Sequence, residues 1–144
     1  MQTGSRLTAF VPSTDLARSE AFYAAVLGLP VRELTPYALV LDGLGTELRV
    51  TLVAERAAAA YTVLGWVVDD LDESVRDWTA RGVRFLRYDG MDQDDLGAWR
   101  SPSGARIAWF SDPDGNTLSL QQPAPLQQPA PLQQPAPLQP PAPD

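Results

Sequence analysis

The stretch Arg6-Leu-Thr-Ala-Phe-Val-Pro-Ser-Thr-Asp-Leu16 has a counterpart further along the chain, Tyr61-Thr-Val-Leu-Gly-Trp-Val-Val-Asp-Asp-Leu71. Each copy has the apolar run of a strand and then Asp-Leu, which is typical of the start of a helix because a short carboxylate can cap its first turn. Each predicted helix carries an apolar stripe and closes at a glycine, Gly28 or Gly82. The chain therefore contains two copies of one strand-helix unit.

Short β-rich runs follow both predicted helices. The pattern places them at residues 31–34, 37–41 and 47–53 in the first half and at 83–88, 98–101, 105–110 and 117–121 in the second. Asp112-Pro-Asp-Gly-Asn116 is expected to form a tight turn before the last strand, since proline fixes φ and glycine permits a positive φ. The order of elements predicts an α+β fold made of two βαβββ modules.

These elements fit one globular domain over residues 1–121. Module one spans about residues 5–53, a linker covers 54–61, and module two spans about 62–121. Residues 122–144 are a Gln/Pro/Ala-rich repeat that carries nine of the 14 prolines, so we expect polyproline II or disorder there. A ligand for a proline-binding module is the alternative reading of this tail.

The composition excludes several classes of site. The chain has no cysteine and no histidine, which rules out disulfides, zinc knuckles and thiol nucleophiles. All 11 basic residues are arginines and the net charge is −7, so nucleic acid is a disfavoured partner. No run approaches the roughly 20 apolar residues that span a bilayer. We therefore expect a cytoplasmic protein with no membrane contact.

The order of the motifs resembles a known family. Asp15-Leu-Ala-Arg-Ser-Glu-Ala-Phe-Tyr23 and then Leu27-Gly-Leu-Pro30, repeated loosely and closed by Asp112-Pro-Asp-Gly-Asn116, is similar to the vicinal oxygen chelate superfamily. That superfamily contains glyoxalases, bleomycin resistance proteins and extradiol dioxygenases. The resemblance implies that the curved sheets of the paired modules form an open barrel around one cavity. It also implies a homodimer, whose cavities can include residues of both chains.

Metal-dependent members of that superfamily hold the ion with a His or Gln on the first strand of each module and a Glu on the last. Carried over by motif, these positions are Thr8 and Val63 on the first strands and Ser119 on the last strand of module two. Thr51 is a weaker match in module one. None of the four is a usable ligand for a transition metal. We therefore predict no metal, no cofactor and a metal-free branch of the superfamily.

The remaining candidates are residues that could line a cavity. Strand alternation turns Thr8 and Phe10 toward it, and turns Trp66 toward the helices. Alternation also aims Arg49 at the cavity, where it would suit a carboxylate, a phosphate or a stacked aromatic ring; a surface arginine at the barrel edge is the alternative. The predicted ligand-binding residues are Thr8, Phe10, Tyr37, Arg49, Thr51, Val63, Met91 on an acidic loop, Trp99, Trp109, Phe110 and Ser119.

Two points about these residues stay open at the level of sequence. Trp109 and Phe110 must point in opposite directions, and the pattern does not decide which of them faces the cavity. Core packing is an alternative for each aromatic candidate.

The leading functional hypothesis is a metal-free protein that binds a small molecule and sequesters an aromatic natural product or antibiotic. The alternative is a metal-independent lyase, isomerase or cyclase, for which Glu47 is the plausible proton carrier and no catalytic residue is assigned. A metal-dependent glyoxalase or dioxygenase is a third reading, which the missing ligands disfavour.

Overall fold

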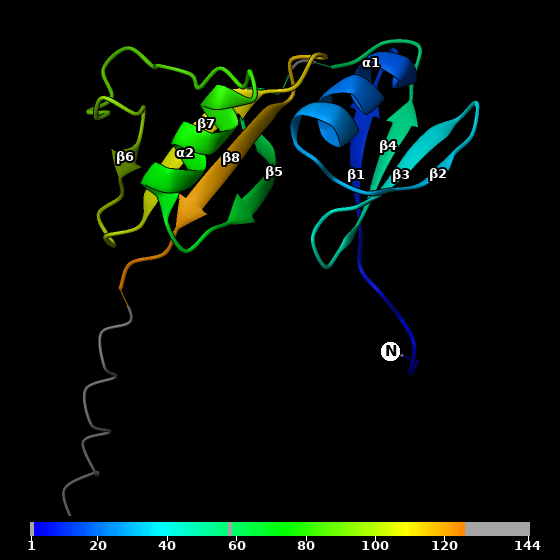
Figure 1. The fold of residues 1–144 in the computed structure, drawn as a ribbon, viewed down its shortest axis with the longest axis horizontal. Coiled ribbons are helices and arrows are strands. Elements are labelled where there is room, and N and C mark those ends of the chain that lie inside the picture. Colours follow the sequence, from blue (N-terminus) through cyan, green and yellow to red (C-terminus); the bar gives the residue numbers. More distant parts are fainter. Residues whose placement is uncertain (1, 58, 126–144) are drawn as a thin grey trace, which may run out of the picture.

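The computed structural model describes residues 2–57 and 59–125, and in this part the chain folds into two four-stranded sheets, each covered by helix on one face (Figure 1). The predicted tail, residues 122–144, lies outside the described residues from 126 onward. Within the described ranges, no helix is both long enough and apolar enough to cross a bilayer.

The first module has the strand order β1-β4-β3-β2, with β1 parallel to β4 and the other pairs antiparallel. Its elements are β1 (Thr8–Ser13), α1 (Leu16–Glu20), the π-helical turn η1 (Ala21–Val26), β2 (Val31–Leu34), β3 (Ala38–Asp42) and β4 (Glu47–Leu52).

The second module repeats this topology in the order β5-β8-β7-β6, with β5 parallel to β8. Its elements are β5 (Thr62–Val67), α2 (Leu71–Ala80), β6 (Trp99–Arg100), β7 (Arg106–Ser111) and β8 (Thr117–Gln122). The predicted α+β fold of two βαβββ modules with open curved sheets is confirmed.

Both helices start and end where the sequence indicates. The Asp15 carboxylate accepts a hydrogen bond from the Arg18 amide, and that of Asp70 accepts one from the Glu73 amide. Gly28 and Gly82 follow the helices with φ of 78° and 103°, a conformation that costs a glycine little. The acidic residues before each helix are therefore caps.

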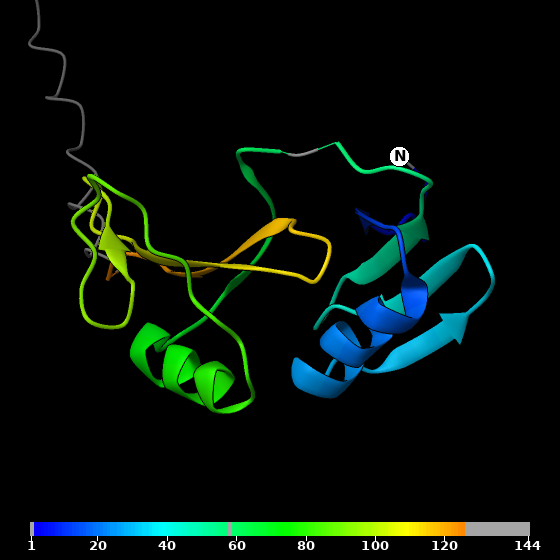
Figure 2. The ribbon, with the colours of Figure 1, turned by 90° about the horizontal axis from the view of Figure 1, so that it is seen from above.

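The helices lie on the same side of the two sheets (Figure 2), and the apolar strand residues turned toward them form the core. Val11, Leu48 and Val50 are almost fully buried on this side in module one. We call the opposite side of each sheet, turned away from α1 and α2, its open face. Strand alternation puts every second residue of β1, β4, β5, β7 and β8 on an open face.

Trp66 belongs to the core side, as predicted. Its ring lies 5.6 Å from that of Trp78 and 6.4 Å from that of Phe110. Phe110 is 0 % exposed and also contacts Phe85 and Phe22. The prediction that Phe110 lines the ligand cavity is therefore wrong: its ring fills the space between the sheet of module two and the helices.

The strand predicted over residues 83–88 does not form. Phe85 makes a single isolated bridge to Phe110, and a side chain of the loop that follows bonds two further backbone groups of the segment. The Gln93 side chain accepts from the Tyr88 amide at 2.7 Å and donates to the carbonyls of Leu86 and Gly97. A side-chain amide thus takes the place of a ladder partner, which the β-rich composition of this segment does not reveal.

The turn Asp112–Asn116 joins the two modules. The Asp112 carboxylate accepts a 2.7 Å hydrogen bond from the hydroxyl of Tyr23, which is fully buried in module one. The Asn116 amide donates to the Pro12 carbonyl, and Asp114 accepts from the amide and hydroxyl of Thr14. Burial and then the charge of Asp112 raise the pKa of Tyr23 well above its usual value, so that its hydroxyl keeps the proton it donates.

Candidate functional site

An aromatic cluster lies on the open face of module two. Trp109 pairs with Ser119 in the ladder between β7 and β8 and points away from the helices, whereas its neighbour Phe110 points into the core. The Trp109 ring lies 5.6 Å from that of Tyr88, nearly perpendicular to it, and 6.1 Å from that of Trp99. We call Tyr88, Trp99 and Trp109 the aromatic wall.

The aromatic wall is held in place by a hydrogen bond to β5 and by the ladder between β6 and β7. The Trp109 indole N–H donates to the Thr62 hydroxyl at 3.1 Å, which ties the ring to β5 across β8. Trp99 pairs with Ile107 in the short ladder between β6 and β7. The three rings expose a partly accessible apolar surface, and such a surface suits a flat ring that stacks or packs edge to face.

Ser119 lies on the same open face and is 9 % exposed. Its partner across the ladder is Gly65, and a Cβ at Gly65 would sit 2.5 Å from the Ser119 hydroxyl oxygen. Val63 lies in the irregular step between Thr62 and Leu64, where the register of β5 shifts, and is half-buried. The missing side chain at Gly65 therefore leaves room for the Ser119 hydroxyl on the face that carries the wall.

The open face of module one is polar along β4 and aromatic along β1. The Thr8 hydroxyl donates to the Glu47 carboxylate at 2.8 Å, and the next pair on the same face is Phe10 with Arg49. Phe10 is 60 % exposed, whereas Arg49 is half-buried. The Thr51 hydroxyl is buried and has no hydrogen-bond partner among the described residues.

The register also tests the predicted metal positions. Phe10 pairs with Arg49, and its counterpart in the internal repeat, Gly65, pairs with Ser119. Arg49, rather than Thr51, is therefore the counterpart of Ser119, which corrects the weaker match made from the sequence.

The corrected positions hold Thr8, Arg49, Val63 and Ser119. None of them is a usable ligand for a transition metal, and the guanidinium would repel a cation. In residues 2–57 and 59–125, no cluster of three or more His, Cys, Asp or Glu could hold a metal. The residues present do not fit the metal of the metal-dependent relatives.

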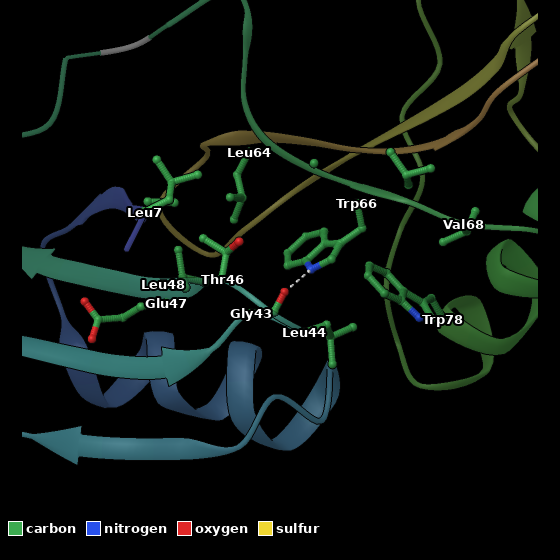
Figure 3. Close-up of a pocket in the computed structure, with 13 residues that line it drawn as sticks. Leu7, Gly43, Leu44, Thr46, Glu47, Leu48, Leu64, Trp66, Val68 and Trp78 are labelled. Atoms are coloured by element: carbon green, nitrogen blue, oxygen red, sulfur yellow. Dashed lines mark hydrogen bonds between the residues drawn. The ribbon is translucent and has the colours of Figure 1, made fainter. Parts of the chain in front are cut away.

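Two of the hollows in the described part of the chain lie close to predicted site residues but outside the aromatic wall. A crevice of about 480 Å³ runs between the modules on the helix side, where Trp66 and Trp78 lie beside the turn that carries Gly43 and Leu44 (Figure 3). The Trp66 indole N–H donates to the Gly43 carbonyl at 3.2 Å. A second, more polar hollow of about 600 Å³ is lined by Thr8 and Glu47, together with Arg6, Arg32 and Asp42. Neither hollow includes Arg49 or the aromatic wall.

The structure gathers the predicted residues into two groups. Trp99, Trp109 and Ser119 share the open face of module two, and Thr8, Phe10, Arg49 and Thr51 share that of module one. Tyr37 is 76 % exposed just before β3, and Met91 is half-buried in the loop before β6. Tyr88 was missed as a wall residue because the sequence placed it at the end of a regular strand.

The whole described domain matches one family model. The Glyoxalase/Bleomycin resistance protein/Dioxygenase superfamily model covers residues 6–120. The chain belongs to this superfamily. No curated protein matches the chain.

Solved structures of the superfamily share the fold. A glyoxalase/bleomycin resistance protein/dioxygenase from Alicyclobacillus acidocaldarius is 21 % identical with a TM-score of 0.66, covering 83 % of this chain and 92 % of that one. A superfamily member from Sphaerobacter thermophilus is 26 % identical with a TM-score of 0.63, covering 83 % and 97 %. TnmS3, an antibiotic binding protein from a Streptomyces species, is 24 % identical with a TM-score of 0.62, covering 86 % and 99 %.

Proposed function

We propose that this superfamily member binds a small aromatic molecule without a metal and sequesters it, as a protein that protects a cell from an antibiotic would. The observation that carries the proposal is the aromatic wall, in which Tyr88 and Trp99 pack around Trp109 on an otherwise open face. Three rings held this way present a preformed surface, so a ligand that stacks there does not have to order it.

Two further observations support this function over metal chemistry. The positions matched to metal ligands hold hydroxyl groups, a valine and an arginine, none of which binds a transition metal well. TnmS3, which has the same fold, is an antibiotic binding protein. Antibiotics are therefore the ligand class that is worth testing first.

Titration with flat aromatic natural products tests the proposal. Binding should change tryptophan fluorescence, because Trp99 and Trp109 form the proposed contact surface. Trp109→Ala should weaken binding, measured by calorimetry, by about tenfold or more, since stacking on one aromatic side chain contributes about 1–3 kcal/mol.

The matched control is Trp78→Phe, which changes a tryptophan on the helix side and keeps an aromatic ring against Phe110. Its affinity should equal that of the unaltered chain. If no compound of a broad aromatic panel binds the folded protein, or if both variants bind equally well, the proposed function is wrong.

We further propose that the binding unit is a homodimer. Phe10 and Val67 point from the open faces of the two modules and are 60 % and 71 % exposed, which is a high exposure for apolar side chains on adjacent modules. A second copy would cover them and enclose the open faces. Light scattering coupled to size exclusion should give twice the chain mass of 15.6 kDa, and a monomer at all micromolar concentrations would refute the dimer.

A metal-independent enzyme remains a second candidate because of Glu47. This carboxylate is half-buried, shares the open face with Arg49 and accepts a hydrogen bond from Thr8, so it is placed to exchange a proton with a bound molecule. If the chain turns over any ligand found in the panel, Glu47→Gln should abolish turnover and leave binding within about threefold. Unchanged turnover in that variant would exclude Glu47 as the proton carrier.

A further inference from the structure

Arg49 is the half-buried cation at the centre of the open face of module one. It lies on β4, where its neighbours across the sheet are Phe10 of β1 on one side and Val40 of β3 on the other. No other described residue accepts a hydrogen bond from its guanidinium or forms an ion pair with it. Arg106 at the start of β7 shows the contrast, because its guanidinium lies 2.6 Å from Asp72 and 2.9 Å from Asp94.

A second donor lies on the same strand and the same face. The hydroxyl of Thr51, two residues beyond Arg49, is buried and has no partner among the described residues. A buried hydroxyl without a hydrogen bond is costly, and a ligand oxygen would satisfy it. Two donors without a partner, the charged guanidinium of Arg49 and the buried hydroxyl of Thr51, therefore lie two residues apart on the same face of β4.

The negative charge nearest along the strand is Glu47, two residues before Arg49 on the same face. It accepts from Thr8 rather than from Arg49, and no ion pair links Glu47 to Arg49. An anion on the Glu47 side would be repelled by this carboxylate. An anion on the Thr51 side of Arg49 would be attracted by the guanidinium and could also accept a hydrogen bond from the Thr51 hydroxyl.

We propose that the ligand is an aromatic carboxylic acid. Its carboxylate binds between Arg49 and Thr51, and its ring system packs on the aromatic side chains of the open faces, which are Phe10 and the aromatic wall. This inference rests on the proposed binding function and narrows the ligand class. The planar guanidinium can donate two parallel hydrogen bonds to a carboxylate, and the Thr51 hydroxyl can donate a third. A neutral aromatic molecule would leave both donors unused.

The test uses two probes with the same ring system, one charged and one neutral: anthraquinone-2-carboxylate and its methyl ester, titrated into the full chain by calorimetry. The acid should bind about ten to a hundred times more tightly than the ester, because a charge-assisted hydrogen bond strengthens binding by about that factor. The preference should shrink as salt is raised, since part of the interaction is exposed to screening.

Variants then assign the preference to its residues. Arg49→Gln and Thr51→Val should each reduce the affinity for the acid and leave that for the ester unchanged, with the larger loss in Arg49→Gln. Arg49→Lys should retain part of the preference. The matched control is Arg100→Gln, an exposed arginine on β6 that pairs with Arg106 on the helix side and so lies off the open face; it should keep the full preference.

The outcomes separate the inference from the function on which it rests. Equal affinities for the acid and the ester, or an acid preference that survives both Arg49→Gln and Thr51→Val, would overturn the carboxylate site and leave aromatic binding standing. Failure of both probes, and of the wider aromatic panel, to bind the folded chain would overturn the binding function itself. If Arg49→Gln fails to fold, Thr51→Val and Arg49→Lys decide the question, because either must lower the acid preference.

Discussion

Replacing Asp112 with alanine should strongly destabilise the domain, because this carboxylate holds four hydrogen bonds inside the joint between the modules. It is 5 % exposed and accepts from the Tyr23 hydroxyl, the Asn116 side chain and the amides of Asp114 and Asn116, at 2.7 to 3.0 Å. Each buried donor left without a partner costs about 1–3 kcal/mol, although water entering the cavity recovers part of this. We therefore expect a loss of about 3–5 kcal/mol, a large share of the roughly 5–15 kcal/mol that stabilises a domain.

Tyr23→Phe isolates the bond that crosses from module one to module two. It removes the donor as well as the bond and leaves Asp112 with its other three partners, so the loss should be only about 1–2 kcal/mol. In the double variant the two losses should not add, since each removes the same interaction. Urea unfolding followed by tryptophan fluorescence measures all three variants.

The control for Asp112→Ala is Asp69→Ala, which removes an exposed carboxylate just before the helix cap. It should change stability by less than about 0.5 kcal/mol. A loss below about 1 kcal/mol in Asp112→Ala, or strictly additive losses with Tyr23→Phe, would refute the view that the turn Asp112–Asn116 joins the modules.

Three further predictions concern stability. Burial alone would raise the pKa of Asp114, but hydrogen bonds, first that from the Thr14 amide, and the Arg18 guanidinium lower it below 3.8. The stability that these interactions contribute is therefore lost as the pH falls below that value. In a series of urea unfolding curves at different pH, Asp114→Asn should show a smaller loss of stability at acid pH. Gly65→Ala should cost about 1–3 kcal/mol, and Ser119→Ala should recover part of it in the double variant, because the added Cβ meets the Ser119 hydroxyl. Leu44→Gly should raise the stability by about 0.5–1 kcal/mol, since Leu44 has a φ of 68° and is 69 % exposed; unchanged or lower stability would contradict it.

The sequence predicted what depends on local chemistry. The caps at Asp15 and Asp70 and the glycines after each helix need only the residues of one turn, so their positions followed from the pattern. The inward direction of Trp66 followed from the period of a strand. The order of the elements predicted two βαβββ modules, and the family resemblance implied their open curved sheets.

The sequence did not predict what depends on contacts between distant residues. The segment 83–88 reads as a strand, and nothing within it shows that the Gln93 side chain will use its backbone groups. The choice between Trp109 and Phe110 needed the register of β7 against β8. The match of Arg49 to Ser119 likewise needed the pairing of β1 with β4, because no motif marks the end of β4.

The division of each sheet into a core face and an open face explains how this fold can be kept while its chemistry changes. Leu48 and Val50 pack against the helices, so replacing either would cost core stability. Arg49 lies between them in sequence but on the other face, and it forms no ion pair with any described residue. At a position of this kind, an arginine can replace a metal ligand at little cost in stability. The site then attracts an anion instead of binding a cation. Arg49→Gln tests whether ligand binding and core stability are separate. The preference for the acid over the ester should be lost, while the free energy of unfolding should change by less than about 1 kcal/mol.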